Sequence, residues 1–377
     1  MRADDSYIEA VLGIVEAIPR GRATTYGAIA ELVGSGPRLV GMVLSRHGGP
    51  VPWWRVVRAD GTLPPSHQDE ARAHYLAEGT ALRRSGTTID IGTAFWQPVD
   101  PAQLLAAYDR QLRGEAEVAI SPRWDTAGPL WRAVYGDRGL VTYEDLSGYD
   151  LTALVAETVA YFSAVPGLHS LEWKTRGHDD LPGLHDVLLA AGFVPGEVET
   201  VMVGEAAALA SDPGCCPLPA GVVVRRVDED PDRKRLLAAT SALQDEVFGR
   251  SAGGESLLSR VERSRGAMEV WVAQLIEEPE VGPFEGLVSA GRLEVVPATD
   301  FAGLWGGATL PQWRGRGIYR ALTAARAGSA SARGVRWLQS DCTSMSRPIL
   351  ERSGLVAVTT STPYVWSATS GVRPTRR

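Results

Sequence analysis

The stretch Leu304-Trp305-Gly306-Gly307-Ala308-Thr309-Leu310-Pro311-Gln312-Trp313-Arg314-Gly315-Arg316-Gly317-Ile318-Tyr319-Arg320-Ala321-Leu322 decides the fold of the C-terminal part of this 377-residue chain. Residues 304–310 are predicted to form a strand, and residues 311–317 a turn rich in glycine and arginine. The next apolar residues have the spacing of a buried helix face: Ile318, Ala321, Leu322 and Ala325. In such a strand–turn–helix, backbone N–H groups converge and the helix dipole adds positive potential. The turn is therefore a predicted diphosphate site.

The same stretch resembles the signature of the GNAT superfamily of acetyl-CoA-dependent N-acyltransferases. That signature reads Gln or Arg, two residues, Gly, one residue and Gly after an aliphatic residue, and it is met here by Leu310, Gln312, Gly315 and Gly317. The resemblance extends over about residues 221–367. It implies that acetyl-CoA binds with its diphosphate on residues 314–318 and its pantetheine arm along residues 308–310. The implied cofactor-binding residues are Ala308, Thr309, Leu310, Arg314, Gly315, Arg316, Gly317 and Ile318.

The catalytic groups are not identified by this resemblance. Acyl transfer to an amine requires a base for the ammonium proton, and GNAT enzymes often add an acid, usually a tyrosine on the helix after the next strand. Aligning that helix on residues 351–355 puts Leu350 where the tyrosine usually stands. Tyr319 and Tyr364 remain as alternative acids, and Glu294 and Asp341 as bases. For each of the four, a structural role is the interpretation favoured over a catalytic one.

A second feature of the chain is an internal repeat. The order strand, helix, glycine plus apolar residue, strand is predicted in the middle region, about residues 99–207, and returns in residues 337–366. We interpret this as a diverged duplication. The middle copy has no comparable phosphate loop, so it is interpreted as a non-catalytic GNAT-like half that braces the active one.

The N-terminal region carries the pattern of a small helical domain. A first helix is predicted from Tyr7, a second after the capping pair Thr24-Thr25, and a third from Pro37. The third helix has its apolar stripe on one side, and on the other lie Arg38, Gly41, Met42 and Ser45. Residues 51–57 and the turn at 59–61 predict a strand and turn, the wing of a winged helix-turn-helix.

Charge is distributed unevenly along the chain. The net charge of −7 argues against nucleic-acid binding by the whole molecule. Residues 18–59, however, hold six arginines against the single acid Glu31. A local excess of this kind is typical of a DNA-binding surface, and equally of a solvated basic face.

Residues 7 to about 98 resemble the DNA-binding domain of alkylguanine-DNA alkyltransferases and, more closely, the alkyltransferase-like proteins. The resemblance rests on three motifs, at residues 24–30, 37–41 and 52–56; the last reads Pro52-Trp53-Trp54-Arg55-Val56. In the true alkyltransferases this motif is Pro-Cys-His-Arg-Val and its cysteine takes the alkyl group. Trp53 stands at that position, and because an indole cannot act as the nucleophile, alkyl transfer is excluded.

The resemblance also implies residue roles on DNA. Arg38 would enter the duplex and Tyr26 would push the phosphate while the nucleotide rotates into a pocket walled by Trp53. Trp54 departs from the usual histidine and makes the shape of that pocket an open question. The implied DNA-binding residues are Tyr26, Arg38, Gly41, Ser45, Trp53, Trp54 and Arg55. Sequence-independent DNA binding and a purely structural winged helix remain as alternatives.

Together these patterns predict an α+β, multidomain protein: a winged helix-turn-helix domain (1–98), a degenerate GNAT-like domain (99–210), a linker (211–220), a GNAT acetyltransferase domain (221–367) and a tail (368–377). No apolar run is long enough for a membrane span and no signal peptide is recognised, so we expect a cytoplasmic protein without a membrane partner. The three cysteines fit neither a disulfide framework nor a metal-ligand spacing.

Three functions are compatible with this organisation. The first is a reader of duplex DNA holding an alkylated guanine, with a role in DNA repair, fused to an acetyltransferase whose amine acceptor, a small molecule or a protein, is unknown. The second is a small-molecule acetyltransferase for self-resistance to a DNA-alkylating metabolite. The third is a non-enzymatic DNA-damage binding protein, which Leu350 keeps open.

Overall fold

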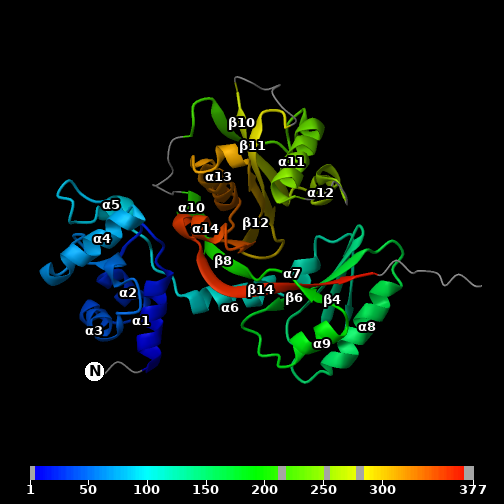
Figure 1. Cartoon of the computed structure of the whole chain (residues 1–377), viewed down its shortest axis with the longest axis horizontal. Helices are drawn as coiled ribbons and strands as arrows, with labels where there is room; N and C mark the ends of the chain where they lie inside the picture. The colour runs from blue at the N-terminus through cyan, green and yellow to red at the C-terminus, as the bar shows by residue number, and fades with distance from the viewer. Residues whose placement is uncertain (1–4, 211–217, 250–254, 277–283, 369–377) are drawn as a thin grey trace, which may run out of the picture.

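The computed structural model describes residues 5–210, 218–249, 255–276 and 284–368. It shows three bodies: a helical N-terminal domain and two α/β halves (Figure 1). Most of the expected linker 211–220 and tail 368–377 lie outside the described residues, as do Cys215 and Cys216. Cys342 is buried.

The N-terminal domain contains the three predicted helices, α1 (Asp5–Ala17), α2 (Tyr26–Leu32) and α3 (Pro37–His47). The Thr25 hydroxyl caps α2 by accepting from the amide of Ala28 at 3.1 Å, and Pro37 occupies the first turn of α3. Two later helices, α4 (Gln68–Glu78) and α5 (Ile91–Ala94), complete the domain.

The predicted strand over residues 51–57 is wrong in its first part. Trp53–Arg55 form a 3-10 helix, and only Val56–Val57 (β2) pair with Thr24–Thr25 (β1), in parallel. The cause is local packing, because the Tyr75 hydroxyl donates to the Trp54 carbonyl at 2.8 Å and draws this segment toward α4. The turn after β2 is present, with the Arg58 amide donating to the Thr62 carbonyl.

Among the described residues, the two α/β halves share one sheet of 12 strands in the order β3-β4-β5-β6-β14-β8-β13-β12-β11-β10-β9, with β7 pairing β14. The first half supplies β3 (Arg123–Ala127), β4 (Leu130–Tyr135), β5 (Arg138–Tyr143), β6 (Ser170–Arg176), β7 (Val194–Pro195) and β8 (Glu199–Glu205). The second supplies β9 (Val222–Arg226), β10 (Met268–Leu275), β11 (Leu287–Val295), β12 (Phe301–Thr309), β13 (Trp337–Cys342) and β14 (Val356–Ser367).

The two halves repeat one pattern of strand pairing, as the predicted duplication requires. In each, three antiparallel strands (β3-β4-β5 and β10-β11-β12) are followed by a parallel pair (β5-β6 and β12-β13). The last strands are exchanged between the halves. β8 pairs β13 of the second half, and β14 runs into the first half to pair β6 (Figure 1).

Helices cover both faces of this sheet. In the second half, α13 (Ile318–Ala332) and α14 (Arg347–Ser353) pack on one face, and α11 (Arg233–Phe248) and α12 (Leu257–Arg263) on the other. The first half adds α6 (Pro101–Leu112), α7 (Glu115–Val118), α8 (Leu151–Ser163), α9 (Leu184–Ala190) and α10 (Ala206–Ala210).

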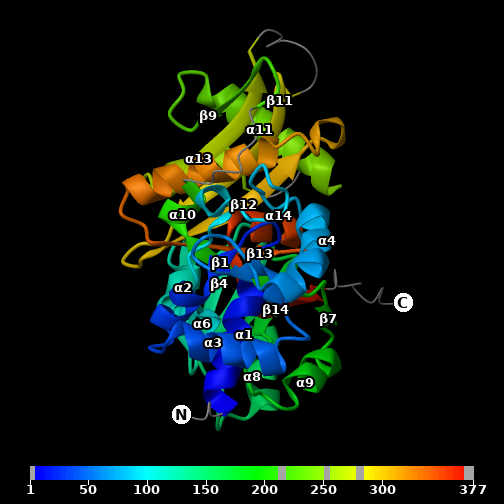
Figure 2. The ribbon, with the colours of Figure 1, turned by 90° about the vertical axis from the view of Figure 1, so that its left-hand side faces the viewer.

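The N-terminal domain is joined to the sheet through a shared core. Buried residues of α1 and α3 form one cluster with α6 and with Val201, Val203, Phe301 and Val356 of the sheet. Figure 2 looks onto this domain, with α1, α2 and α3 in front. Of the helices that the structure describes, none is by itself long and apolar enough to cross a membrane; α2 and α3 meet that test only as a pair bent by 105°.

Candidate active site and candidate nucleic-acid interface

The loop before α13 has the geometry of an anion cradle. Gly315 and Gly317 adopt positive φ values of 73° and 76°, where other residues are strained. Among the described residues no side chain caps α13, and its first turn has no acid, so its leading N–H groups lack a side-chain acceptor there. A Cβ added at Gly315 would meet no atom within 4 Å, so the turn faces open space. Arg314 fixes the loop by donating from Nε to the Thr309 carbonyl at 3.1 Å.

Beside this loop, the ladder between β12 and β13 ends early. Backbone pairing covers only three residues of each strand, Phe301–Gly303 and Trp337–Gln339. One residue further, the Ser340 hydroxyl donates to the Leu304 carbonyl at 3.0 Å. β12 also bulges against β11, because Trp305 pairs Arg292 whereas Ala308 pairs Ala290. Such bulges release backbone groups from the ladder and are frequent next to active sites.

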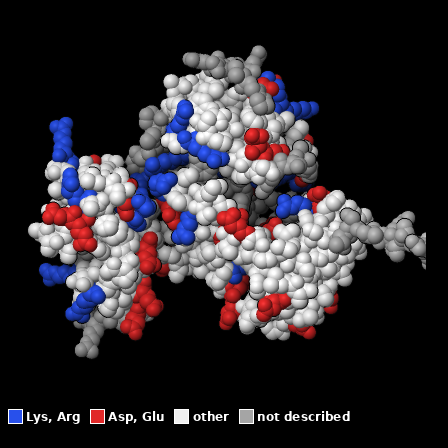
Figure 3. Space-filling view, in the orientation of Figure 1, with Lys and Arg blue, Asp and Glu red and all other residues white. Residues whose placement is uncertain are grey.

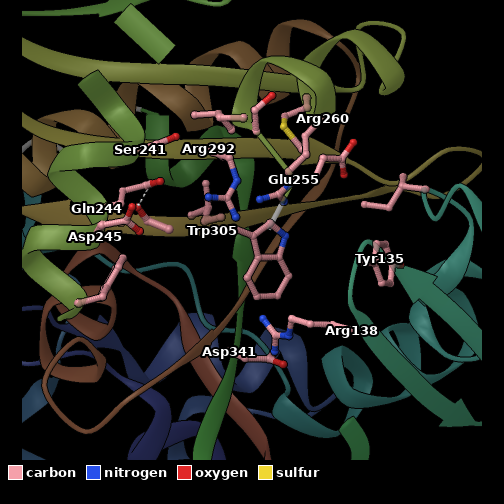
Figure 4. A pocket seen from close by; sticks show the side chains of 18 of the residues that line it. Tyr135, Arg138, Ser241, Gln244, Asp245, Glu255, Arg260, Arg292, Trp305 and Asp341 are labelled. Carbon is pink, nitrogen blue, oxygen red and sulfur yellow. Dashed lines mark hydrogen bonds between the residues drawn. The ribbon is translucent and has the colours of Figure 1, made fainter. Parts of the chain in front are cut away.

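A cavity of about 1240 Å³ lies where this ladder ends, between the two halves (Figure 4). The second half lines it with residues 304–307 and 340–342 and with parts of α11 and α12. The first half contributes Tyr135, Arg138, Lys174 and Glu199. The space-filling view shows a hollow between these two bodies, rimmed by basic and acidic side chains (Figure 3).

The four catalytic candidates are placed differently. Asp341 and Tyr319 line the cavity, and a Cβ at Gly307 would fall 2.7 Å from the Tyr319 hydroxyl, so that ring lies against the β12 bulge. Glu294 binds two cavity-lining arginines. Tyr364 is not brought to the cavity: its hydroxyl lies 2.7 Å from Nδ1 of His185 in the core of the first half. Leu350 is 1% exposed and lines the cavity, but its apolar side chain cannot donate a proton.

A buried ionic network joins the halves at one end of the cavity. Lys174 Nζ lies 2.7 Å from Oδ2 of Asp341 and 3.4 Å from Glu117, which also binds Arg176. Burial alone would lower the pKa of Lys174, but Asp341 and Glu117 raise it above its ordinary range. Burial also raises the pKa of Glu199, and the Asp341 charge adds to this rise. Lys174 is therefore a fixed cation, and Glu199 a carboxyl group that holds its proton unusually well.

The sequence analysis missed most of the polar residues that line the cavity, among them Tyr135, Glu199, Arg260 and Arg292. The first two come from the half interpreted as a brace, and only the strand exchange brings them to the cavity. Arg292 carried a usable signal, because Arg292 and Glu294 alternate on one face of β11.

In the N-terminal domain, the predicted DNA-reading residues of α2 and α3 lie on one surface. Arg38, Gly41 and Ser45 follow each other at helical spacing on α3, and the Arg38 and Ser45 side chains are exposed. The Tyr26 ring lies against Gly41, where an added Cβ would come 3.9 Å from Cε1. Burial raises the pKa of Tyr26, with the opposing charge of Arg58 a smaller effect, so its hydroxyl is neutral at physiological pH. Basic side chains project from the outer edge of this domain (Figure 3).

The motif at residues 53–55 is held by α4. Trp54 stacks on His74 with ring centroids 3.6 Å apart, and its indole N–H donates to Glu78 at 3.1 Å. Trp53 meets Trp54 edge-on at 5.9 Å. Arg55 donates twice to Glu78, at 3.0 and 2.7 Å, and once to the Ile18 carbonyl. The Arg55 guanidinium thus shapes this domain from within. Trp53 packs on His67 and the cluster around Tyr75, whereas no hydrogen bond or ion pair of the exposed Arg38 side chain is seen among the described residues.

Comparison with known proteins separates the chain into two parts. Residues 6–80 match the family model of the 6-O-methylguanine DNA methyltransferase DNA-binding domain. A DNA base-flipping protein of Escherichia coli K12 is 42% identical over 102 residues, which are 26% of this chain and 78% of the relative. One of Vibrio parahaemolyticus is 30% identical over 100 residues, 25% of this chain and 99% of the relative.

The remainder is similar to solved acetyltransferase structures. A GCN5-related N-acetyltransferase from Kribbella flavida covers 72% of this chain and 96% of its own, with 18% identity and a TM-score of 0.50. At this identity the likeness concerns the fold alone. The chain is thus a mixed α/β multidomain protein with a GNAT-like fold over much of its length.

Proposed function

Because the chain belongs, through its N-terminal domain, to the family of alkyltransferase-like DNA base-flipping proteins, we propose that it binds duplex DNA containing an alkylated guanine and acetylates an amine with its C-terminal half. In this proposal residues 1–98 are a winged-helix reader. Residues 99–210 and 221–367 are tandem GNAT-like halves, of which the second binds acetyl-CoA. The observation that carries the transferase part is that the Gly315 loop leads directly to Tyr319, which lies against the bulged part of β12 and lines the shared cavity.

In the N-terminal domain, different residues attract the DNA backbone and distinguish a damaged base from an undamaged one. Exposed arginines such as Arg46 attract phosphate whatever the base, and this attraction falls with salt. Arg38 and Tyr26 act only when a nucleotide leaves the stack, which costs a few kcal/mol and less for a base that pairs poorly. Trp53 offers an aromatic wall but no thiolate, so the base is bound and not repaired.

The residues of the C-terminal half fit acetyl-CoA. Backbone N–H groups of residues 314–318 would hold its diphosphate, since Gly315 faces open space and the first turn of α13 contains no acid. When bound, acetyl-CoA supplies an acetyl thioester that an amine can attack. In this proposal Asp341 and Glu199, which line the cavity, take the ammonium proton, and the Tyr319 hydroxyl beside the bulge protonates the departing sulfur.

Calorimetry with matched glycine variants tests the cofactor site. Gly315→Asp in the full chain should abolish acetyl-CoA binding, because it adds a negative charge where the diphosphate lies. Gly334→Asp is the control: its φ of 79° and open surroundings impose similar backbone strain, but it follows the far end of α13. Unchanged affinity in folded Gly315→Asp would remove the loop from the proposal. Cofactor binding without turnover of any amine would favour the non-enzymatic alternative. That outcome would agree with Leu350, which stands where a tyrosine acid is usual.

Arg38→Ala in the full chain tests the reader. We expect it to reduce the preference for duplex holding an O-alkylated guanine over plain duplex, whereas Arg46→Ala should weaken binding to both DNAs equally and lessen the salt dependence. Equal losses on both DNAs for Arg38→Ala would make Arg38 a phosphate contact. Absence of any lesion preference in the wild-type chain would refute the reader itself.

A further inference from the structure

The cavity between the halves holds an excess of positive charge at one end. Arg260 of α12 and Arg292 of β11 both line it, and both bind the same carboxylate, Glu294, at 3.4 and 2.8 Å. The side chains of Arg292 and Glu294 are 14% and 12% exposed. Burial lowers the pKa of Arg260, and the neighbouring Arg292 charge lowers it further. Lys234, Asp245, Glu255 and Arg263 also line this side, and Arg263 pairs with Glu255. In the described part of the chain, four cations therefore face three carboxylates, Glu294 included, and one positive charge remains uncompensated.

The opposite end holds an excess of negative charge. Lys174 binds Glu117 and Asp341, Arg176 binds Glu117, and Arg138 pairs with Glu172. Glu199 adds one more acidic group, without an ion pair of its own among the described residues. Asp341 is the group that points to a ligand, because its side chain is 5% exposed and only Oδ2 is bound by Lys174. No described residue donates to its Oδ1, although the residue lines the cavity. A buried carboxylate oxygen without a donor is costly, and a bound ammonium would satisfy it.

Both ends belong to one space. Figure 4 shows Trp305 between Arg292 on one side and Asp341 on the other. Tyr135 of the first half connects the two ends. Its hydroxyl donates to the carbonyl of Glu117, a residue of the acidic end, at 3.2 Å. Its pKa is raised mainly by burial, then by Glu117 and Glu294, and lowered by Arg260, so that it responds to groups of both ends.

We propose that the cavity takes a small amine that also carries an anionic group, with the ammonium at Asp341 and Glu199 and the anion at Arg260 and Arg292. This inference rests on the proposed acetyl transfer and names the class of its acceptor. The anion is a carboxylate or a phosphate, which bind guanidinium groups alike. The middle half is then part of the site, because Glu199 comes from its exchanged strand β8.

The chemistry balances with these residues. The ammonium loses two protons as the amide forms: one passes to a carboxylate of Glu199 or Asp341, and the other leaves with the sulfur as the carbon–sulfur bond breaks. An acceptor with both charges satisfies both ends at once. An amine without an anionic group leaves the excess positive charge at the arginines unpaired. The resulting difference in binding free energy between the two kinds of amine is the basis of selectivity.

Three matched amines distinguish the possibilities: 4-aminobutyrate, 3-aminopropyl phosphate and butylamine. For the full chain with acetyl-CoA we expect either anionic amine to have a KM at least about tenfold below that of butylamine, the value for one charge-assisted contact. The better of the two identifies the anion. Calorimetry of the same amines should give the same order of affinity.

Arginine variants supply the decisive comparison. Arg292→Met should raise the KM of the anionic amines about tenfold and leave that of butylamine and the affinity for acetyl-CoA unchanged. Arg260→Met is a second, independent variant should the first fail to fold. Arg292→Glu should shift preference toward the diamine putrescine, which loss of structure alone cannot do.

The outcomes separate this inference from the function on which it depends. Normal acetyl-CoA binding with equal use of butylamine and the anionic amines would overturn the inference and leave the transferase standing. Better acetylation of a lysine peptide than of any small amine would also overturn it. Failure to bind acetyl-CoA would refute the proposed function, and the amine affinities measured by calorimetry would still decide whether the cavity prefers the doubly charged ligand.

Discussion

Replacing Glu78 by alanine should release the segment that carries Trp53 and Trp54. Glu78 is the common acceptor of this segment: it receives two hydrogen bonds from Arg55, one from the Trp54 indole and one from the Gly21 amide at 3.4 Å. The side chains of Arg55 and Glu78 are 11% and 6% exposed, so water cannot replace these bonds without opening the domain.

The magnitude follows from these contacts. Each hydrogen bond to a charged group contributes about 1.5–3 kcal/mol. Removal of one partner of a buried ion pair costs about 3–5 kcal/mol, because the other charge stays buried. We therefore expect a loss of about 4 kcal/mol, which raises the opening equilibrium of this segment roughly a thousandfold. Glu78→Gln keeps an acceptor and should lose less.

Hydrogen exchange measured by mass spectrometry is the appropriate assay, because local opening need not unfold the rest of a multidomain chain. Peptides covering residues 51–57 and 68–80 should exchange faster in Glu78→Ala by up to that factor. Glu70→Ala is the matched control, since Glu70 is an exposed acid on the same helix. An acceleration below about tenfold would show that Trp54 stacking and apolar packing, and not the ion pair, hold the segment.

The same pair predicts a pH dependence. Burial by itself would raise the pKa of Glu78, but the hydrogen bonds and charge of Arg55 outweigh it and hold that pKa below its ordinary value. The stabilisation is therefore complete above about pH 4.3, the ordinary glutamate value, and is lost as the pH falls through the depressed value of the folded state. The acid-induced opening of residues 51–57 should have no such component in Glu78→Gln.

Three further predictions concern the chemistry of the chain. Because burial and then Asp341 raise the pKa of Glu199, acetyl transfer should rise with pH above the ordinary glutamate range, and Glu199→Gln should flatten that rise; an unaltered pH profile in the variant would exclude Glu199 from the reaction. Burial raises the pKa of the Cys342 thiol to about 12, so peptide mapping at pH 8 should find it unmodified by iodoacetamide in the folded chain and modified in urea, and fast labelling of the folded chain would contradict its burial. Incubation with alkylated duplex should leave the intact mass unchanged, and a stoichiometric adduct within residues 5–98 would show a nucleophile other than Trp53.

Local signals predicted the elements that depend on local physics. Thr25 and Pro37 placed the starts of α2 and α3, and the glycines at 315 and 317 placed the turn before α13, because caps and positive φ angles are decided within a few residues. The 3-10 helix at 53–55 was not predictable in this way. It depends on Tyr75 and Glu78, which are distant in sequence.

The composition of the cavity was beyond sequence reasoning for a different reason. An alternating apolar pattern identifies a strand but not its neighbour, so the partners of β8 and β14 could not be derived. The duplication pattern even favoured two separate halves. Asp341 was found as a candidate, whereas Lys174 and Glu199, which face it from the other half, were not.

The exchange of strands between the halves determines when the sheet can be completed during synthesis. During synthesis, β6 and β8 leave the ribosome long before β14, the strand that lies between them. The middle of the sheet therefore remains an open gap, with two unpaired edges, until nearly the whole chain has emerged. Open edges of this kind are sites for pairing with other chains, and contacts between distant segments form slowly. A nascent chain that stalls after residue 355 would thus lack β14 and leave β6 and β8 each with an unpaired edge, so the sheet is completed only by its last strand.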